Sequence, residues 1–150
     1  MDNSVSSPIR LDEFWPYQVV VLADQISRHT LEVVRSEANL NQSQWRVLAA
    51  VADRPGRSSA EVTTVTPMDK TIVSRAVASL IKSGLIKRTP SQEDKRISAL
   101  EMTELGAQRY ALIADKLAQT LNAPTLDGHS TKDFNTAVKE FSRYMAELTS

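Results

Sequence analysis

The stretch from residue 66 to residue 84 restricts the fold more than any other part of this sequence. Its apolar residues recur at steps of three and four, which predicts an amphipathic helix with one buried face. The buried face would hold Ile72, Val73, Ala76, Val77, Leu80 and Ile81. The opposite face would hold Lys70, Thr71, Ser74, Arg75, Ala78 and Lys82. We therefore expect a helix that packs on one side and presents a small, polar and positively charged surface on the other.

Signals at both ends delimit this helix. Thr66 suits the cap position and Pro67 the first helical position. Asp69 is favourable in the first turn because the N-terminal end of a helix attracts negative charge. Gly84 suits the turn that closes the C-terminal end.

A shorter helix is expected directly before it. Ser58 and Glu61 have the S-x-x-E spacing of a capping box, and Ala60, Val62 and Val65 would pack this helix onto the core. Two helices joined by a tight turn, the second with basic and hydroxyl side chains near its start, match the geometry that places a helix in the DNA major groove.

Two alternating segments follow, residues 85–89 and 97–102, and they predict a β-hairpin beside this helix. Arg96 at its tip could enter the minor groove, and Asp94 could hold the guanidinium in a bidentate pair. Lys95 and the pair Lys87 and Arg88 could meet phosphates. The alternative is an ordinary exposed ion pair of small energetic value.

Charge is distributed unevenly although the net charge is zero. Residues 54–96 contain nine Lys or Arg against four Asp or Glu, whereas residues 1–53 and 97–150 are both acidic. A basic segment between acidic ends is typical of a nucleic-acid-binding surface, and a solvated protein face is the alternative.

Helical periodicity covers most of the remaining chain. One long helix is expected at about residues 11–37, with Pro16 near its first turns, and another after Asn41, which with Gln44 would form its cap. Residues 103–149 predict two more helices, joined by NAPTLDGH. The apolar stripes of the terminal helices favour burial against a second copy in a homodimer; a monomeric helical bundle is the alternative.

Several functional classes are disfavoured. The chain has no cysteine, which excludes disulfides and thiolate metal sites, and His29 and His129 lie far apart without other ligands nearby. No catalytic motif is present, so we expect neither an enzyme nor a cofactor. The N-terminal stretch MDNSVSSPIR lacks an apolar signal region and no segment suits a membrane span, which favours a cytoplasmic location without membrane contact.

Residues from about 41 to 110 resemble the winged helix-turn-helix core of the MarR family of bacterial regulators. The resemblance is carried by NQSQWRVLAAV, MDKTIVSRAVASLIKSGLIKR and EDKRISALEMTELG. The last stretch is similar to the family's D-x-R, strand and L-T-x-x-G sequence, with Met102 in place of the leucine. The resemblance implies that Arg96 is the minor-groove arginine with Asp94 as its partner, and that Ser74 and Arg75 lie in the helix that enters the major groove.

The resemblance also implies an architecture and a function. The fold would be mainly α with a small β-hairpin wing (α+β), in one domain over residues 1–150. Its DNA-binding core would span about residues 41–102, between dimerisation helices at about 11–37 and 103–149. The function would be a homodimeric regulator, most often a repressor, released from a palindromic operator in double-stranded DNA by a small aromatic or phenolic ligand. The alternative is a winged-helix DNA-binding or protein-interaction module without ligand control.

In the family, ligands bind where the first, second and fifth helices converge. The residues of this chain that could contribute there are Trp15, Tyr17, His29, Trp45 and Arg46. Their aromatic rings could stack on a ligand and their cationic groups could bind a carboxylate, although each residue could equally serve in packing.

Overall fold

The computed structural model describes residues 7–150; residues 1–6, which begin the stretch MDNSVSSPIR, lie outside the described residues. Its helices are α1 (Trp15–Ala38), α2 (Gln42–Asp53), α3 (Ser59–Val65), α4 (Lys70–Lys82), α5 (Glu104–Leu121) and α6 (Thr131–Leu148). Its strands are β1 (Ile86–Pro90), β2 (Ser98–Met102), β3 (Thr125–Leu126) and β4 (His129–Ser130).

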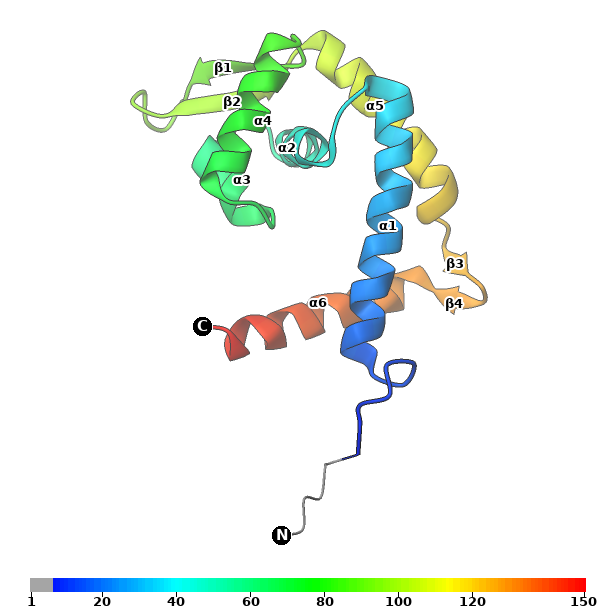
Figure 1. Cartoon of the computed structure of the whole chain (residues 1–150). Coiled ribbons are helices and arrows are strands. Elements are labelled where there is room, and N and C mark those ends of the chain that lie inside the picture. The colour runs from blue at the N-terminus through cyan, green and yellow to red at the C-terminus, as the bar shows by residue number, and fades with distance from the viewer. Residues whose placement is uncertain (1–6) are drawn as a thin grey trace.

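These elements form a winged helix-turn-helix unit with long helices extending from it (Figure 1). Helices α2, α3 and α4 and the hairpin β1–β2 gather at one end, and α1 runs away from that end along α5. Helix α6 crosses α1 near its N-terminal end, where the Trp15 and Phe141 ring centroids are 5.0 Å apart. The arrangement confirms the expected fold class, mainly α with a small β-hairpin wing.

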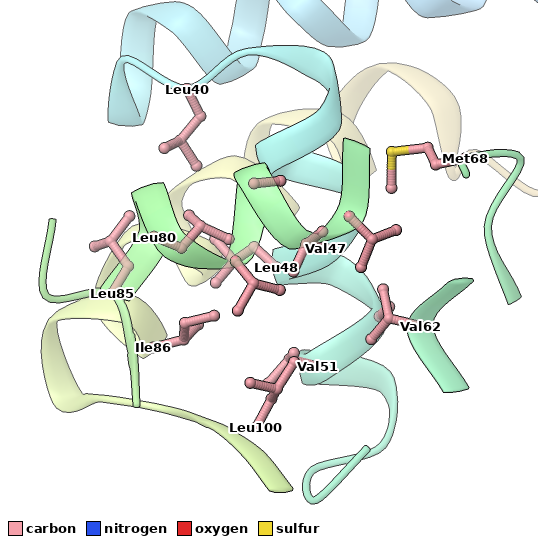
Figure 2. Packing of buried hydrophobic residues seen from close by; sticks show 14 of the residues in the cluster. Leu40, Val47, Leu48, Val51, Val62, Met68, Leu80, Leu85, Ile86 and Leu100 are labelled. Carbon is pink, nitrogen blue, oxygen red and sulfur yellow. The ribbon is translucent and has the colours of Figure 1, made fainter. Parts of the chain in front are cut away.

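The hydrophobic core lies inside the winged unit (Figure 2). Its fully buried side chains come from α2, α3, α4 and the wing strands, and include Val47, Leu48, Val51, Val62, Val73, Val77, Leu80, Ile86 and Leu100. Val34 of α1 and Ile113 of α5 join the same core. Each buried aliphatic side chain contributes about 1.5–3 kcal/mol, so this core holds the winged unit together and ties it to both long helices.

Three residues predicted to be buried are exposed instead. In α3 only Val62 is buried, while Ala60 and Val65 are exposed. At about 100° per residue, Ala60 and Val62 point in directions about 200° apart, so one face could not have buried both. Ile72 of α4 is 40% exposed because it lies at the edge of the buried stripe.

Helix α1 begins at Trp15, four residues later than predicted from the apolar spacing. Pro16 explains the difference, because proline has no N–H for the helical ladder and its ring clashes with a preceding turn. A helix that began at residue 11 would place Pro16 in its interior, whereas here proline lies in the first turn.

The predicted start of α4 is also wrong. Helix α4 begins at Lys70, and Asp69 is its cap: the Asp69 carboxylate accepts the backbone N–H of Ile72 at 2.8 Å. The Thr66 hydroxyl instead donates to the Val62 carbonyl at the end of α3. Aspartate is a stronger N-cap than threonine, and burial of Met68 between the two helices fixes the connecting turn.

The wing is an antiparallel hairpin whose strands lie within one residue of the predicted segments. Its register pairs Ile86 with Met102 and Pro90 with Ser98. Leu100 also bonds the segment before α3, since its carbonyl accepts from Gly56 N–H and its N–H donates to the Arg57 carbonyl. The wing is therefore attached to the helix-turn-helix by backbone bonds as well as by apolar packing.

The segment NAPTLDGH is more ordered than the linker expected from the sequence. It contains the small hairpin β3–β4, whose turn has Asp127 at φ +50° and Gly128 at φ +80°. Asp-Gly is a strong signal for a two-residue hairpin because both positions require positive φ. The hairpin leads directly into α6, which Ser130 caps.

Candidate nucleic-acid interface

Helix α4 presents the surface that its sequence predicts. All five α4 side chains assigned to DNA contact are exposed: Lys70, Thr71, Ser74, Arg75 and Lys82. The opposite face of the helix is anchored in the core, so its exposed face has a defined orientation. A face of this composition fits a groove lined by phosphates and base edges.

A hydrogen bond between helices α2 and α4 fixes the orientation further. Gln44 Nε2 of α2 donates to Ser79 Oγ of α4 at 2.6 Å. The Gln44 amide oxygen also accepts the Asn41 N–H, so one side chain both caps α2 and contacts α4. The sequence predicts the capping role of Gln44 but not its contact with Ser79, because residues 35 positions apart share no local spacing signal.

Hydrogen bonds also connect the C-terminal end of α4 to the start of α5. The Thr103 hydroxyl donates to the Gly84 carbonyl at 2.5 Å and accepts the Gly106 N–H at 3.0 Å. The Thr103 N–H donates to the Leu85 carbonyl at 3.0 Å. A Cβ atom on Gly106 would lie 1.9 Å from the Leu85 oxygen, so the close approach of the two segments requires glycine.

At the wing tip, the contact between Asp94 and Arg96 differs from the prediction. Asp94 Oδ1 accepts the backbone N–H of Arg96 at 2.9 Å, and the ion pairs of residues 7–150 do not include one between these two side chains. The expected bidentate pair is therefore wrong for this structure. A short acidic side chain two residues before its partner reaches the backbone more readily than a long, exposed guanidinium.

The four basic residues of the wing lie in two different places, the tip and strand β1. Lys95 and Arg96 are exposed at the tip, and Lys87 and Arg88 are exposed on β1. Consecutive strand residues point to opposite faces, so Lys87 and Arg88 cannot contact the same row of phosphates. Lys87 Nζ lies 3.9 Å from a Glu101 carboxylate oxygen across the hairpin.

A groove of about 790 Å³ runs between the wing and the segment before α3. Its lining includes four acidic residues, Glu61, Glu93, Asp94 and Glu101. The Ser58 N–H bonded to the Glu61 carboxylate, together with nearby Arg54, lowers the pKa of Glu61. Four carboxylates against the one guanidinium of Arg54 make this groove an unfavourable site for phosphate.

The five proposed ligand residues do not lie together. Trp15 and Tyr17 are exposed near the start of α1, and Trp15 packs against Phe141. His29 lies fourteen residues further along α1, about 21 Å away at 1.5 Å per residue, and its Nε2 is 2.9 Å from Thr120 Oγ1. One small ligand cannot contact both ends of this helix within one chain.

Trp45 and Arg46 lie on α2. The Trp45 ring stacks on Tyr110 of α5 with 5.7 Å between centroids, at the edge of the core, and Arg46 is half-buried. Stacking gives Trp45 a packing role that the sequence left open.

Apolar side chains remain exposed on the helices outside the winged unit. Helix α6 contains no buried residue, although Phe134, Val138, Phe141, Met145 and Leu148 follow one another along one stripe. Each of these five is 44–63% exposed. On α1, side chains from Trp15 to Ile26 are similarly exposed. Monomeric proteins seldom leave apolar surface of this extent uncovered.

We also searched the part of the chain that the structure describes for a metal site and for a membrane-spanning helix. Residues 7–150 contain no group of three or more His, Cys, Asp or Glu placed to hold a metal ion. In the same residues, none of the helices combines the length and the apolar character that crossing a membrane requires.

Comparison with known proteins supports the same assignment for the winged unit. Residues 38–97 match the model of the MarR family. Over 77 residues, the chain is 27% identical to the HTH-type transcriptional regulator YybA of Bacillus subtilis (strain 168). That match covers 51% of this chain and 51% of the relative, so the chain spans about half the length of the curated relative it matches.

Solved structures share the fold over nearly the whole chain. A MarR/EmrR family regulator from Acinetobacter sp. ADP1 superimposes with a TM-score of 0.76 at 20% identity, covering 93% of this chain and 99% of its own. A mutant of MarR from E. coli, complexed with operator DNA, has a TM-score of 0.69 at 18% identity, covering 92% and 99%. MarR of Staphylococcus aureus, in complex with salicylate and kanamycin, has a TM-score of 0.69 at 20% identity, covering 93% of each chain.

The family match lies on the same segment as the geometry described above. It runs from the end of α1 to Ile97 and includes α2, the helix pair α3–α4, strand β1 and the wing tip. Residues 38–97 of this chain are therefore similar to the MarR family, and the chain shares the fold of solved MarR-family regulators.

Proposed function

We propose that this protein is a homodimeric, sequence-specific regulator that places α4 in the major groove of an operator and the wing tip in the adjacent minor groove. The observation that carries the proposal is the exposed face of α4, which is basic and polar while its opposite face is fixed in the core. Lys95 and Arg96 are exposed at the wing tip, and backbone bonds to Leu100 attach the wing to the helix pair.

The individual residues would have different roles. Ser74 and Arg75 would contact base edges, with Lys70 and Thr71 at the start of α4 beside them. Phosphate contacts would come from Lys82, Lys87, Arg88 and Lys95. Arg96 would enter the minor groove, where the potential is most negative. Asp94 would shape the turn that presents Arg96, through its bond to the Arg96 N–H.

Dimerisation would bury the apolar stripes of α1 and α6 against the same helices of a second copy. The support is the exposure of large apolar side chains along both helices outside the winged unit. A two-fold dimer would present two α4 helices to a palindromic operator, with half-sites about one helical turn apart.

The proposal includes release of a repressor from its operator by a small aromatic ligand. Its support is the fold shared with the Staphylococcus aureus MarR in complex with salicylate and kanamycin. Because α1 separates Trp15 and Tyr17 from His29, such a ligand would contact one of these groups and not both. A thermal-shift series with aromatic carboxylates and phenols, repeated on the DNA complex, tests this part: a ligand should raise Tm and release the DNA.

Selection of bound fragments from a genomic library tests the DNA-binding proposal. The expected result is a palindromic sequence, protected from hydroxyl radicals at two successive turns of the duplex. Recovery of fragments without a shared sequence would contradict sequence-specific regulation.

A further inference from the structure

We propose that Ile72 contacts the 5-methyl group of a thymine in each operator half-site, an inference that rests on the proposed function. Ile72 belongs to the first turn of α4 and is 40% exposed. The core takes its α4 side chains from Val73, Ala76, Val77 and Leu80 instead. Ile72 therefore fits the apolar spacing of α4 but lies outside the core.

Ile72 also lies in a surface groove beside the face of α4 that is proposed to contact DNA. Ile72 lines a groove of about 370 Å³ between α4 and the start of α2. The other lining residues are Asn41, Ser43 and Gln44 from α2 and Arg75, Ala76 and Ser79 from α4. On this groove, Ile72 lies one helical turn from Arg75, the side chain proposed to contact bases. A ligand group that enters here meets aliphatic carbon beside a guanidinium.

A single exposed isoleucine is common on protein surfaces and by itself indicates no function. What distinguishes Ile72 is the face it borders, where the exposed neighbours Thr71, Ser74 and Arg75 are all polar. In the major groove the thymine methyl is the apolar group that a side chain can recognise, since the other edge positions are hydrogen-bond donors and acceptors. An aliphatic side chain at the flank of the helix can pack against that methyl group. This contact would add selectivity for a T·A pair at a position that Arg75 does not contact.

Replacement of thymine by deoxyuridine in the operator tests this contact, because it removes the methyl group alone. In wild type, one thymine in each half-site should respond, with binding weakened roughly fourfold for each methyl lost, as expected for one buried methyl-sized group. Ile72→Ala should bind the thymine operator more weakly and lose the response at that thymine. Ile72→Val, which keeps branched methyl groups, should retain most of the response.

Val65→Ala is the matched control, since Val65 is also an exposed aliphatic residue but lies on α3. It should retain the full deoxyuridine response, and equal melting temperatures would show that the variants are folded. A response of Ile72→Ala equal to wild type at every thymine would overturn the contact, as would a wild type that binds its operator specifically yet ignores every deoxyuridine. Equal wild-type affinity for operator and shuffled duplex would refute the proposed function itself.

Discussion

The carboxylate of Asp94 accepts the backbone N–H of Arg96 at 2.9 Å, and the Asp94 carbonyl accepts the N–H of Ile97 at 3.0 Å. These two bonds close the wing tip around Asp94, while the Arg96 side chain is exposed. Asp94 therefore fixes the backbone that carries Arg96 and not the guanidinium. The role depends on an acceptor oxygen and not on a negative charge.

This geometry predicts different effects for two substitutions of Asp94. Asp94→Asn keeps the acceptor oxygen and removes a charge near phosphate, so it should bind the operator at least as tightly as wild type. Asp94→Ala loses the bond to the Arg96 N–H and should weaken binding by roughly 0.5–1.5 kcal/mol per subunit, the usual net value of one hydrogen bond. Fluorescence anisotropy at fixed salt measures both. If Asp94→Ala binds more tightly than wild type, the repulsion between the Asp94 carboxylate and phosphate has a larger effect than the hydrogen bond that holds the turn.

Gly106→Ala should destabilise the protein, although alanine is the better helix former. On an exposed helix surface this change would stabilise by up to about 1 kcal/mol. Here the new Cβ would lie 1.9 Å from the Leu85 oxygen, so the joint between α5 and the turn after α4 must open. We expect a loss of roughly 2–4 kcal/mol in the free energy of unfolding, measured in urea. Gln108→Ala, on the exposed surface of α5, should change it by less than about 0.5 kcal/mol.

Val138→Asp should convert the proposed homodimer into monomers. Val138 is 44% exposed on the apolar stripe of α6, so a carboxylate there would be tolerated in a monomer but not in an apolar interface. Sedimentation equilibrium should give half the mass of wild type. Thr136→Asp adds the same charge on the opposite, exposed face of α6 and should leave the dimer intact. If the Val138→Asp protein is still a dimer, the interface does not lie on the apolar stripe of α6.

Stability should fall in acid partly through Glu37. Hydrogen bonds from Lys116 and Ser36 lower the pKa of Glu37 below its ordinary value of 4.5. A carboxyl whose folded-state pKa is lowered stabilises the fold above the unfolded value and loses this contribution as the pH falls through the folded pKa. Glu37→Gln should therefore be less stable than wild type at pH 7, and the difference should vanish as the pH falls below 4.5.

Lys116→Met gives the reciprocal control for Glu37. Because it removes the first cause of the lowered pKa, it should reduce the same acid-dependent loss, measured by urea unfolding at a series of pH values. Parallel stability curves for wild type and both variants would show that the contact between Glu37 and Lys116 has no effect on folding.

Local signals in the sequence predicted local structure well. The capping boxes at Asn41 and Ser58 both form, because their partners lie three residues away on the same helix. The polar face of α4 is likewise set by spacing within one helix. Errors of one to four residues arose at helix and strand ends, where Pro16 and Asp69 decide the boundary.

Contacts between elements distant in sequence could not be predicted. Gln44 meets Ser79, and Gly106 meets Leu85, only after the helices have packed. For the same reason the spacing that predicts the buried stripe of α4 does not show that Ile72 is left outside the core. The Asp94 contact was mispredicted because, at a tight turn, the backbone N–H of Arg96 lies closer to the Asp94 carboxylate than the Arg96 guanidinium does.

The salt dependence of operator binding tests the DNA-binding role of α4 and the wing most directly. If the basic segment of residues 54–96 meets the duplex twice in a dimer, about 6–10 phosphates are neutralised, and log K should fall with log salt concentration at a slope near −5 to −9. Lys82→Ala should make the slope shallower by roughly one for each phosphate contact it removes. Anisotropy titrations of operator and shuffled duplexes over a salt series should show this slope together with tighter binding to the operator. A slope shallower than about −2, or equal affinity for the two duplexes at every salt concentration, would contradict sequence-specific DNA binding by α4 and the wing.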